Sequence, residues 1–336
     1  MITLQELHER DKRPPSVTVY MICYNHEKYL DEAMYGVLMQ KTNFPVNIVI
    51  HDDASPDRSG EIIRKYAAEN PNITAILEET NFYQNGKSFL PIVIPHFTGK
   101  YIACCECDDF WIDENKLQIQ VDYLENNPDC IAVYSNSLPV NKYSQYDEAA
   151  RVPAYAKTSE GDYPSDDLFA FHNQLATCVI RNFWQFMSPE DVNFYASLRG
   201  PGDRKIMALC LRLGRVHYFS QEFAAYRHVI DEGTSFSATI RRLSKWERLK
   251  HDVRYNTDIR LMLNHFFGIK FYRIYIQVLY DEIRFRLKYH KSIIKEADLS
   301  SRYHLRNIPL HAYAAFPFYC VYRAARKLAR ILFRHK

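Results

Sequence analysis

The first 136 residues alternate between short apolar runs and segments with helical spacing, and this alternation limits the fold more than any other feature. Residues 16–23 form an almost continuous apolar, β-prone run, as expected of a strand buried on both faces. Further strands are predicted at residues 46–50, 73–77, 101–105 and 130–134, and helices at 27–40, from residue 57 or 59 to 67, and at 114–126. This order favours an α/β fold with a doubly wound sheet, in which ligands bind beyond the carboxyl ends of the strands.

The second half of the chain carries weaker signals. Residues 89–96 form a short apolar segment, residues 138–167 are polar and turn-rich and predict a long loop, and residues 174–180 predict a strand. A turn at residues 200–203 opens a predicted helix that runs to residue 213. Two short strands are predicted at 216–219 and 223–226, and the pattern beyond residue 239 is helical, aromatic and basic.

The charge of the chain is divided unevenly. The total is +3, but residues 1–239 carry −12 and residues 240–336 carry +15. The division indicates an acidic catalytic body and a basic tail that meets an anionic partner. Residues 323–336 interleave basic and apolar side chains, which is typical of an in-plane helix on an anionic membrane surface. The alternative is a solvated helix that packs on the body; nucleic-acid binding is disfavoured because no recognised module accompanies the charge.

The eight cysteines lie mostly inside apolar runs, where a free thiol behaves as a small hydrophobic group. No second pair or histidine spacing completes a zinc site. On a strand, Cys105 and Cys107 would share one face and Cys104 the other, so core packing is expected. With no N-terminal signal peptide and no apolar run of about 20 residues, the sequence predicts a protein of the reducing cytoplasm.

Polar side chains follow three of the predicted strands at the point where each ends. Tyr24 and Asn25 follow the first strand, residues 52–53 (Asp-Asp) follow the second, and residues 106–109 (Glu-Cys-Asp-Asp) follow the fourth. Because parallel strands end at the same edge of a sheet, these groups should converge on one rim.

Carboxylates at positions i and i+2, such as Glu106 and Asp108, suit one chemical task especially well. They hold a hard divalent cation against the phosphates of a nucleotide, and without a cation their like charges repel. The alternative interpretation is a solvated acidic turn. For Asp52 and Asp53 the alternative is an Asx turn followed by a helix cap.

Three segments carry a family resemblance. SVTVYMICYNHEKYLDEAM, VIHDDASPDRS and GKYIACCECDDFWIDENKLQIQVDYLENNPDC, in this order, resemble the nucleotide-binding half of family 2 glycosyltransferases, notably bacterial enzymes that build capsular or lipopolysaccharide chains. The resemblance is strong over residues 14–136, looser over 170–236 and absent from the tail. It implies an α/β GT-A fold, a Rossmann-like nucleotide-binding mixed sheet flanked by helices, with a helical basic C-terminal extension.

The resemblance also implies a domain division. Residues 1–236 would form the GT-A domain, with a nucleotide-sugar-binding half at 14–136 and an acceptor and catalytic half at 137–236. Residues 237–336 would form the basic helical region, where membrane association is expected.

At the donor site, the resemblance assigns Tyr24 and Asn25 to the loop that lines the nucleotide base. Asp53 matches the acid that accepts a hydrogen bond from the ring N–H of the base, a role that suits a carboxylate. Asp52 would support this loop, and Ser55 and Asp57 would cap the next helix.

For the metal, residues 106–108 stand where the family has its DxD motif. Asp108 takes the position of the ligand to Mn²⁺ or Mg²⁺, and Glu106 that of a contact to the ribose or to a metal-bound water. Asp109 would orient the donor sugar, and Trp111 is expected to pack in the core. His228, in Tyr226-Arg227-His228, resembles a family histidine that completes the metal shell or contacts the diphosphate, although the family usually places one residue between arginine and histidine.

The general base is expected from the second half of the chain. Family members present an acid on a turn before a helix, and Gly202-Asp203 fits that form. Asp203 would take the proton from the acceptor hydroxyl in an inverting transfer, in which one acid suffices. Asp191 is the rival and Glu190 a weaker one; otherwise Asp203 merely caps the helix. The Q-x-x-R-W signature of processive relatives is absent, which favours transfer of a single sugar.

The resemblance therefore implies a metal-dependent inverting glycosyltransferase that uses a nucleotide-diphosphate sugar, with uridine favoured. The acceptor would be a glycan or lipid-linked sugar in bacterial surface polysaccharide synthesis, at the inner face of the cell membrane. One alternative is a nucleotidyltransferase on a related sheet, which should have a Gly-rich loop where this chain has Tyr24-Asn25-His26-Glu27. The other is an inactive relative that serves as a binding protein.

Overall fold

The structure, a computed structural model, describes residues 1–151, 160–165, 174–229, 239 and 241–269 and the single residues 283, 317 and 320. The chain divides into two compact units, Met1–Arg241 and Arg242–Lys336.

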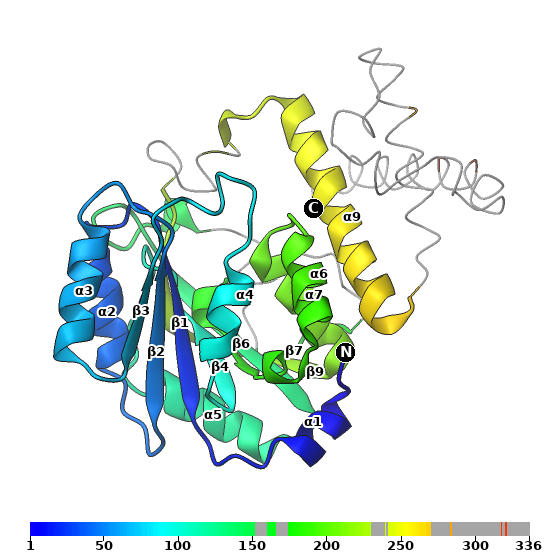
Figure 1. Ribbon diagram of the computed structural model, residues 1–336, viewed down its shortest axis with the longest axis horizontal. Helices are drawn as coiled ribbons and strands as arrows, with labels where there is room; N and C mark the ends of the chain where they lie inside the picture. The colour runs from blue at the N-terminus through cyan, green and yellow to red at the C-terminus, as the bar shows by residue number, and fades with distance from the viewer. Residues whose placement is uncertain are drawn as a thin grey trace. The chain divides into compact units, whose positions relative to one another are not determined.

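One mixed sheet organises the described part of the first unit (Figure 1). The strand order is β3-β2-β1-β4-β8-β6-β9-β5, and β7 pairs with β9 outside this path. The strands are β1 (Val17–Cys23), β2 (Val46–Asp52), β3 (Ile73–Leu77), β4 (Tyr101–Cys104), β5 (Phe110–Trp111), β6 (Cys130–Val140), β7 (Gly161–Asp162), β8 (Val179–Arg181) and β9 (Arg215–Arg227).

Strands β1 to β4 form the parallel part of the sheet. β1 pairs in parallel with β2 and with β4, and β2 pairs in parallel with β3. Cys23 at the end of β1 lies opposite Asp52 at the end of β2. β2 runs two residues beyond the predicted end because His51 and Asp52 still pair with β3. The carboxyl ends of these strands therefore lie at one edge, as the sequence predicts.

Helices cover both faces of the parallel strands. In Figure 1, α2 and α3 lie on one side and α4 with α6 on the other. The helices of this unit are α1 (Leu4–Arg10), α2 (Leu30–Leu38), α3 (Ser59–Glu69), α4 (Leu90–Val93), α5 (Lys116–Asn126), α6 (Pro189–Ser197) and α7 (Gly202–Leu213). The sequence analysis missed α1, α6 and β5, which are short elements with little periodicity to reveal them.

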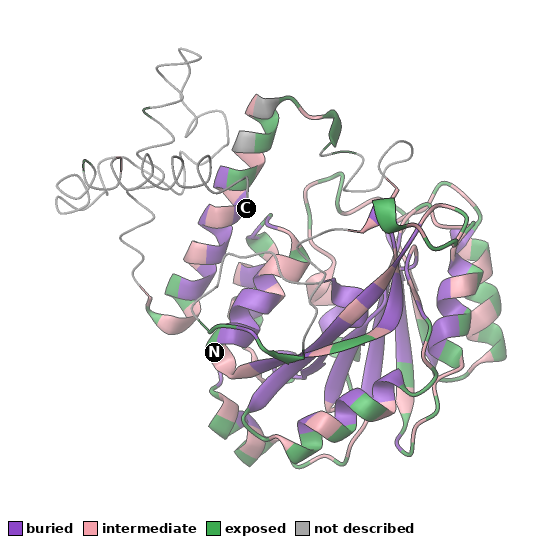
Figure 2. Cartoon of the chain, turned by 180° about the vertical axis from the view of Figure 1, so that it is seen from behind, coloured by how far each residue is buried: buried purple, intermediate pink, exposed green. Residues whose placement is uncertain are grey.

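The core follows the alternation of side chains along β1. Val17, Val19, Met21 and Cys23 join a buried cluster with residues of α2, α3 and α5. On the other face, the Tyr20 ring lies 5.2 Å from the Phe97 ring, measured between centroids. β1 is therefore buried on both faces, as Figure 2 shows in purple.

The cysteines near β4 follow the same alternation. Cys105 and Cys107 belong to the buried cluster that includes residues of α2 and α5, whereas Cys104 is buried outside it. Trp111 is 1% exposed, and its indole N–H donates to the carbonyl oxygen of Ala176 at 2.8 Å. The predicted core roles of these residues are confirmed.

The second half departs from the prediction at three places. β6 continues to Val140, into the predicted loop, because it pairs in parallel with β9 along its length. β9 is one strand rather than two: a register shift between Ser135 and Asn136 lets the pairing continue past the polar residues 220–221. Residues 175–177 form a 3₁₀ turn, so the strand predicted at 174–180 is reduced to Val179–Arg181.

In the second unit, α9 (Lys245–Phe267) begins with a capping box between Ser244 and Glu247 and ends before Gly268, whose φ is 63°. The amphipathic helix predicted at residues 323–336 lies outside the described residues. No helix among the residues with described structure has the length and apolar character needed to cross a membrane.

Candidate active site at the carboxyl ends of the strands

Several hydrogen bonds join the loops that follow β1 and β2. Three run from a backbone N–H of the first loop to a side-chain oxygen of the second segment: Asn25 to Ser55 at 2.9 Å, His26 to Ser59 at 3.0 Å, and Glu27 to Asp57 at 2.9 Å. Another runs the opposite way, from the backbone N–H of Arg58 to the Glu27 carboxylate at 3.0 Å. The two loops therefore form one unit at the rim of the sheet.

These bonds explain why the predicted cap of α3 is wrong. The residue before the helix is Arg58, which makes no side-chain capping bond. Ser55 and Ser59 instead accept hydrogen bonds from the loop after β1. Oδ1 of Asp57 accepts from the backbone N–H of Ser59 at 3.0 Å, but its Oδ2 accepts from the backbone N–H of Glu27. The local sequence suggests that these oxygens cap α3. Those of Ser55 and Ser59, and Oδ2 of Asp57, instead bond the loop after β1.

Asp52 and Asp53 are both buried and hydrogen-bonded to backbone. Asp52 accepts from the backbone N–H of Ser55 at 3.3 Å and from its hydroxyl, so it holds the loop. The two carboxylate oxygens of Asp53 accept from the backbone N–H groups of Phe82 at 2.6 Å and Tyr83 at 3.1 Å. Asp53 thus anchors the segment after β3, and its contact with a nucleotide base stays a prediction.

Tyr24 and Asn25 lie in the loop directly after β1. The hydroxyl of Tyr24 accepts a hydrogen bond from the Gln84 side-chain amide at 2.9 Å, which places the half-buried ring beside the segment after β3. Asn25 is exposed and has a φ of 61°, a left-handed conformation that asparagine tolerates. Both residues border the space above the strand ends.

The acidic stretch runs alongside the end of β1. The backbone N–H groups of Cys105 and Cys107 donate to the carbonyl oxygens of Tyr20 and Ile22, both at 3.0 Å. The stretch therefore continues the ladder of β4 with Cys105 and Cys107 in the core. Glu106 lies between them and is partly exposed, as is Asp108, whose side chain is 29% exposed.

Asp203 joins this acidic group from the other half of the chain. Burial, Asp108 and Asp203 raise the pKa of Glu106 to about 8, against a smaller opposing effect of His26. Burial also raises the pKa of Asp203, which lies in the first turn of α7. The structure thus brings Glu106, Asp108 and Asp203 into one electrostatic group.

His26 is part of the same group, and the sequence analysis gave it no role. Its Nε2 lies 3.8 Å from Oδ2 of Asp108. Burial alone would lower the pKa of His26, but the Asp108 carboxylate and Cys23 outweigh it and raise the pKa to about 9. The only signal in the sequence is that His26 directly follows Asn25 at a strand end.

Asp109 points in a different direction from its neighbours. It is 2% exposed, and its Oδ1 accepts from the backbone N–H of Arg227 at 2.8 Å. Its Oδ2 has no hydrogen-bond partner within the described ranges. Burial, Asp108 and Glu106 raise the pKa of Asp109.

His228 and Asp191 each contact a different part of the chain. Nδ1 of His228 lies 2.9 Å from the carbonyl oxygen of Ala150, which can only accept, so Nδ1 donates in this contact. Asp191 lies 3.7 Å from the N-terminal amine of Met1. Asp203, by contrast, contributes to the raised pKa of Glu106, and its role as the base stays a prediction.

Whether a divalent cation fits this site depends on which side chains could bind it. Among the residues that the structure describes, no three His, Cys, Asp or Glu side chains are grouped as a metal site, so His228 is not gathered with Glu106 and Asp108. Mg²⁺ and similar cations, however, are usually bound by one or two carboxylates together with substrate phosphates and water. Glu106 and Asp108, both partly exposed, would supply the one or two carboxylates of that kind of site.

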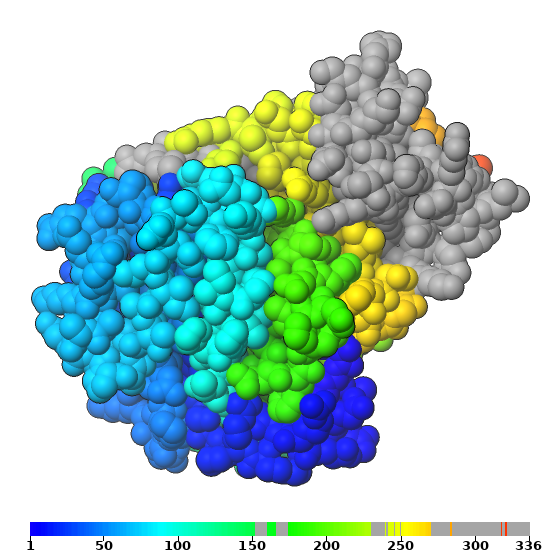
Figure 3. Space-filling view, viewed as in Figure 1, coloured from blue at the N-terminus to red at the C-terminus, as the bar shows by residue number. Residues whose placement is uncertain are grey.

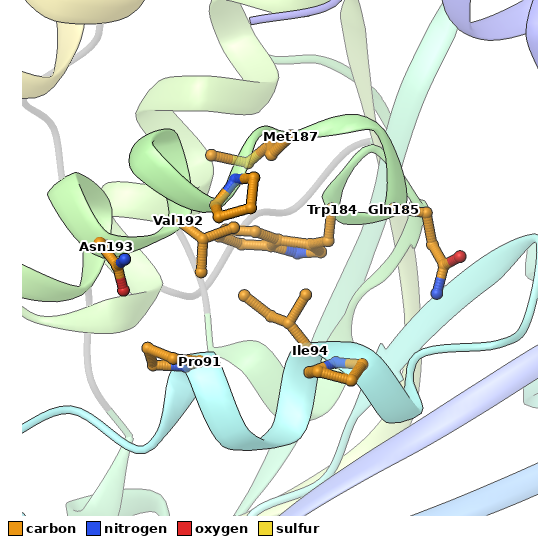
Figure 4. Close-up of a pocket in the computed structure, with 9 residues that line it drawn as sticks. Pro91, Ile94, Trp184, Gln185, Met187, Val192 and Asn193 are labelled. Carbon is orange, nitrogen blue, oxygen red and sulfur yellow. The ribbon is translucent and has the colours of Figure 1, made fainter.

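A separate cavity of about 360 Å³ lies between α4 and α6. Figure 4 shows Pro91 and Ile94 facing Trp184 and Val192 across it. In Figure 3 the cyan surface of α4 adjoins the green surface of α6. The cavity includes none of the predicted site residues.

The raised pKa of Glu106 predicts how the metal-free protein responds to pH. A carboxyl group with a pKa of about 8 when folded and 4.5 otherwise keeps its proton longer in the folded state. Its contribution to stability is therefore present at low pH and is lost as the pH rises towards 8. We expect the melting temperature of the metal-free protein to fall less steeply between pH 5 and pH 9 in Glu106→Gln than in the wild type.

The control for this measurement is Glu61→Gln, which changes a carboxylate in α3 whose side chain is 68% exposed. Thermal unfolding across the same pH range should give the wild-type slope for this variant. A Glu106→Gln protein with the wild-type slope would contradict the assignment of the raised pKa to Glu106.

Comparison with known proteins agrees with this geometry. The family model described as glycosyl transferase family 2 matches residues 18–189, more than half of the chain. An uncharacterized protein of Mycobacterium bovis is 41% identical over 116 residues, which are 34% of this chain and 32% of that protein. An uncharacterized glycosyltransferase of Methanocaldococcus jannaschii is 32% identical over 128 residues, 38% of this chain and 42% of that protein. The matched region spans less than half the length of either relative.

Among solved structures, the S. aureus protein TarS in complex with UDP-GlcNAc superposes with a TM-score of 0.55. The match covers 81% of this chain and 74% of that chain at 15% sequence identity, so it bears on the fold alone. It confirms the predicted GT-A fold, a mixed sheet flanked by helices. With the family model matched across the strands that carry the acidic group, the chain belongs to glycosyl transferase family 2.

Proposed function

We propose that this protein is a metal-dependent inverting glycosyltransferase that transfers a single sugar from a nucleotide-diphosphate sugar. The observation that carries the proposal is the meeting of Glu106 and Asp108 with Asp203 at the carboxyl ends of the strands. A site of this kind offers carboxylates for a cation and a separate carboxylate for proton transfer.

The donor would lie across the rim formed by the loops after β1, β2 and β4. Tyr24 and Asp53 would contact the base, and Glu106 and Asp108 would hold Mn²⁺ or Mg²⁺. A cation held there neutralises charge on the departing diphosphate. TarS was crystallised with UDP-GlcNAc, which favours a UDP-sugar here.

Asp203 would act as the general base. Its raised pKa moves the carboxylate towards the range in which proton transfer near neutral pH is efficient. It accepts the proton of the acceptor hydroxyl while that oxygen forms a bond to the anomeric carbon. The bond from this carbon to the diphosphate oxygen breaks on the opposite side, so the configuration inverts.

The experiment that tests this function is a donor panel. The full-length protein is incubated with Mn²⁺ and UDP-, GDP- or dTDP-sugars, and thermal stabilisation and released nucleoside diphosphate are measured together. One donor that stabilises the protein only with Mn²⁺ and is slowly hydrolysed would support the proposal. A folded protein that responds to none of them would contradict it.

The acceptor is proposed to be a glycan or a lipid-linked sugar of bacterial surface polysaccharide synthesis. The +15 charge of residues 240–336 supports a place on the anionic inner face of the cell membrane, since each basic residue near such a surface contributes about 1 kcal/mol.

Removal of residues 318–336 is expected to abolish co-sedimentation with vesicles that contain anionic lipid, because the deletion removes the whole of the predicted amphipathic helix at residues 323–336. Vesicles of neutral lipid are the control and should bind neither form. Equal sedimentation of the shortened and full-length proteins with anionic vesicles would contradict the membrane proposal.

A further inference from the structure

Arg227, the last residue of β9, connects four segments around the acidic stretch. Its side chain is 1% exposed, so the guanidinium is buried while charged. The contacts are with Asp108 and Asp109 of the acidic stretch, with Tyr29 and Glu32 at the start of α2, with Phe110 of β5, and with Asn141 and Ser144 after β6.

Two of these contacts fix the backbone that carries Asp108. Nε of Arg227 donates to the carbonyl oxygen of Asp108 at 2.8 Å. The backbone N–H of Arg227 donates to the carboxylate of Asp109, also at 2.8 Å. The chain is therefore held on the C-terminal side of Asp108, which limits the positions that the Asp108 side chain can take.

The other contacts hold the guanidinium itself. Nη2 donates to Glu32 Oε2 at 2.6 Å, and Nη1 donates to the Ser144 hydroxyl at 2.9 Å. The same hydroxyl donates to Glu32 at 2.6 Å, which closes a three-membered ring of hydrogen bonds. The Tyr29 ring lies 4.1 Å from the guanidinium carbon, measured to the ring centroid. The guanidinium of Arg227 is thus held by residues at the start of α2 and after β6, which lie outside the acidic stretch.

In this ion pair Arg227 is buried but the side chain of Glu32 is 36% exposed, and the cost of removing the guanidinium from water offsets much of the attraction, so the pair is weak evidence for stability. The planar guanidinium nevertheless presents five donors in a rigid fork, which no other side chain does. Its position here uses those donors to tie α2 and the segment after β6 to the residue proposed to hold the cation.

We propose that Arg227 is the positioning residue that orients Asp108 towards the cation and the diphosphate. The inference rests on the proposed function, because it concerns the same site. Arg227 would act through the backbone carbonyl of Asp108 and the side-chain carboxylate of Asp109 and would not itself contact the donor.

The matched control is Arg181, a second buried arginine of the same sheet. It is 4% exposed and donates to the carbonyl oxygen of Cys130 at 2.8 Å and to the hydroxyl of Tyr101 at 3.1 Å. Arg181 pairs with Tyr101 at the amino end of β4, away from the acidic stretch. Arg181→Lys therefore removes similar hydrogen bonds without touching the site.

The test compares Arg227→Lys and Arg181→Lys in the full-length protein. Calorimetric titration with UDP at a series of Mn²⁺ concentrations gives the concentration of Mn²⁺ that half-saturates UDP binding. Loss of a group that orients a metal ligand typically costs 10–100-fold in metal affinity. We expect Arg227→Lys to raise the half-saturating concentration by about 10-fold or more. In Arg181→Lys this concentration should stay within about twofold of the wild-type value, because the groups that orient the proposed metal ligand are unchanged.

Other outcomes contradict the inference. Equal values for Arg227→Lys and the wild type would overturn it, as would equal increases in both variants. If Arg227→Lys does not fold, Glu32→Gln loosens the same guanidinium from α2 and should raise the half-saturating concentration in the same direction; no rise would overturn the inference. A wild-type protein that binds none of UDP, GDP and dTDP with Mn²⁺ would overturn the proposed function and this inference with it.

Discussion

Replacement of Asp108 by asparagine is expected to lower Mn²⁺-dependent hydrolysis of the preferred donor by a factor on the order of 10³. A bound metal contributes several kcal/mol of charge stabilisation in the transition state, and each 1.36 kcal/mol is a factor of ten in rate. Asparagine has nearly the same shape but no charge, so it weakens the hold on the cation while the backbone contacts to Arg227 remain. Initial rates of nucleoside diphosphate release at saturating Mn²⁺ measure the effect.

The control for this variant is Asp122→Asn. Asp122 is an exposed carboxylate on α5, where it accepts a hydrogen bond from the Gln118 side chain at 2.9 Å. Its replacement removes one negative charge without entering the acidic group, so the rate should stay at the wild-type value. Full activity in a folded Asp108→Asn protein would refute the metal assignment.

Replacement of Asp203 by asparagine is expected to lower sugar transfer by about 10²–10⁴-fold, the range that a positioned general base contributes. Donor binding should be nearly unchanged, because Asp203 is assigned to the acceptor and not to the nucleotide. Asparagine can still accept the hydrogen bond that the backbone N–H of Arg204 donates to Asp203 Oδ1 at 2.7 Å, so the start of α7 should be preserved. Transfer to the acceptor and calorimetric binding of UDP with Mn²⁺ separate the two effects.

Asp191→Asn is the matched comparison, since Asp191 is the rival acid and lies near the N-terminal amine of Met1. It should transfer sugar at close to the wild-type rate. The opposite result, with transfer lost in Asp191→Asn and kept in Asp203→Asn, would show that Asp191 is the general base and Asp203 is not. Loss of UDP binding in Asp203→Asn would point to a role at the donor.

The rim of the site was predictable because the strands that build it are encoded locally. The apolar run that becomes β1 specifies a buried strand by itself, and parallel strands must end at one edge. Tyr24, Asp53 and Glu106 therefore take their places from neighbouring sequence. Asp203 was predicted from the family form of a turn before a helix, and its effect on Glu106 places it in the acidic group.

The contacts that sequence reasoning missed all join distant segments. A serine before a helix is a good local cap, yet Ser55 and Ser59 bond the loop after β1 instead. Nothing local shows that His26 lies beside Asp108, or that Arg227 reaches the acidic stretch. Such choices are decided by the tertiary arrangement of the loops.

Strand lengths were misjudged for a related reason. The polar residues 220–221 suggest a turn between two strands, but β9 continues through them because β6 supplies a partner along both halves. A register shift absorbs the irregularity at a place that the sequence of β9 alone does not mark.

The most direct test of the central claim is to locate the cation. Crystals of the full-length protein grown with UDP and Mn²⁺, measured at the manganese absorption edge, give its position from anomalous scattering. The account predicts one Mn²⁺ bound by Asp108 and by oxygens of the diphosphate, at roughly 2.0–2.2 Å as is usual for small divalent cations with oxygen ligands. A diphosphate bound at the rim with no Mn²⁺ beside Asp108, or Mn²⁺ bound elsewhere, would contradict it.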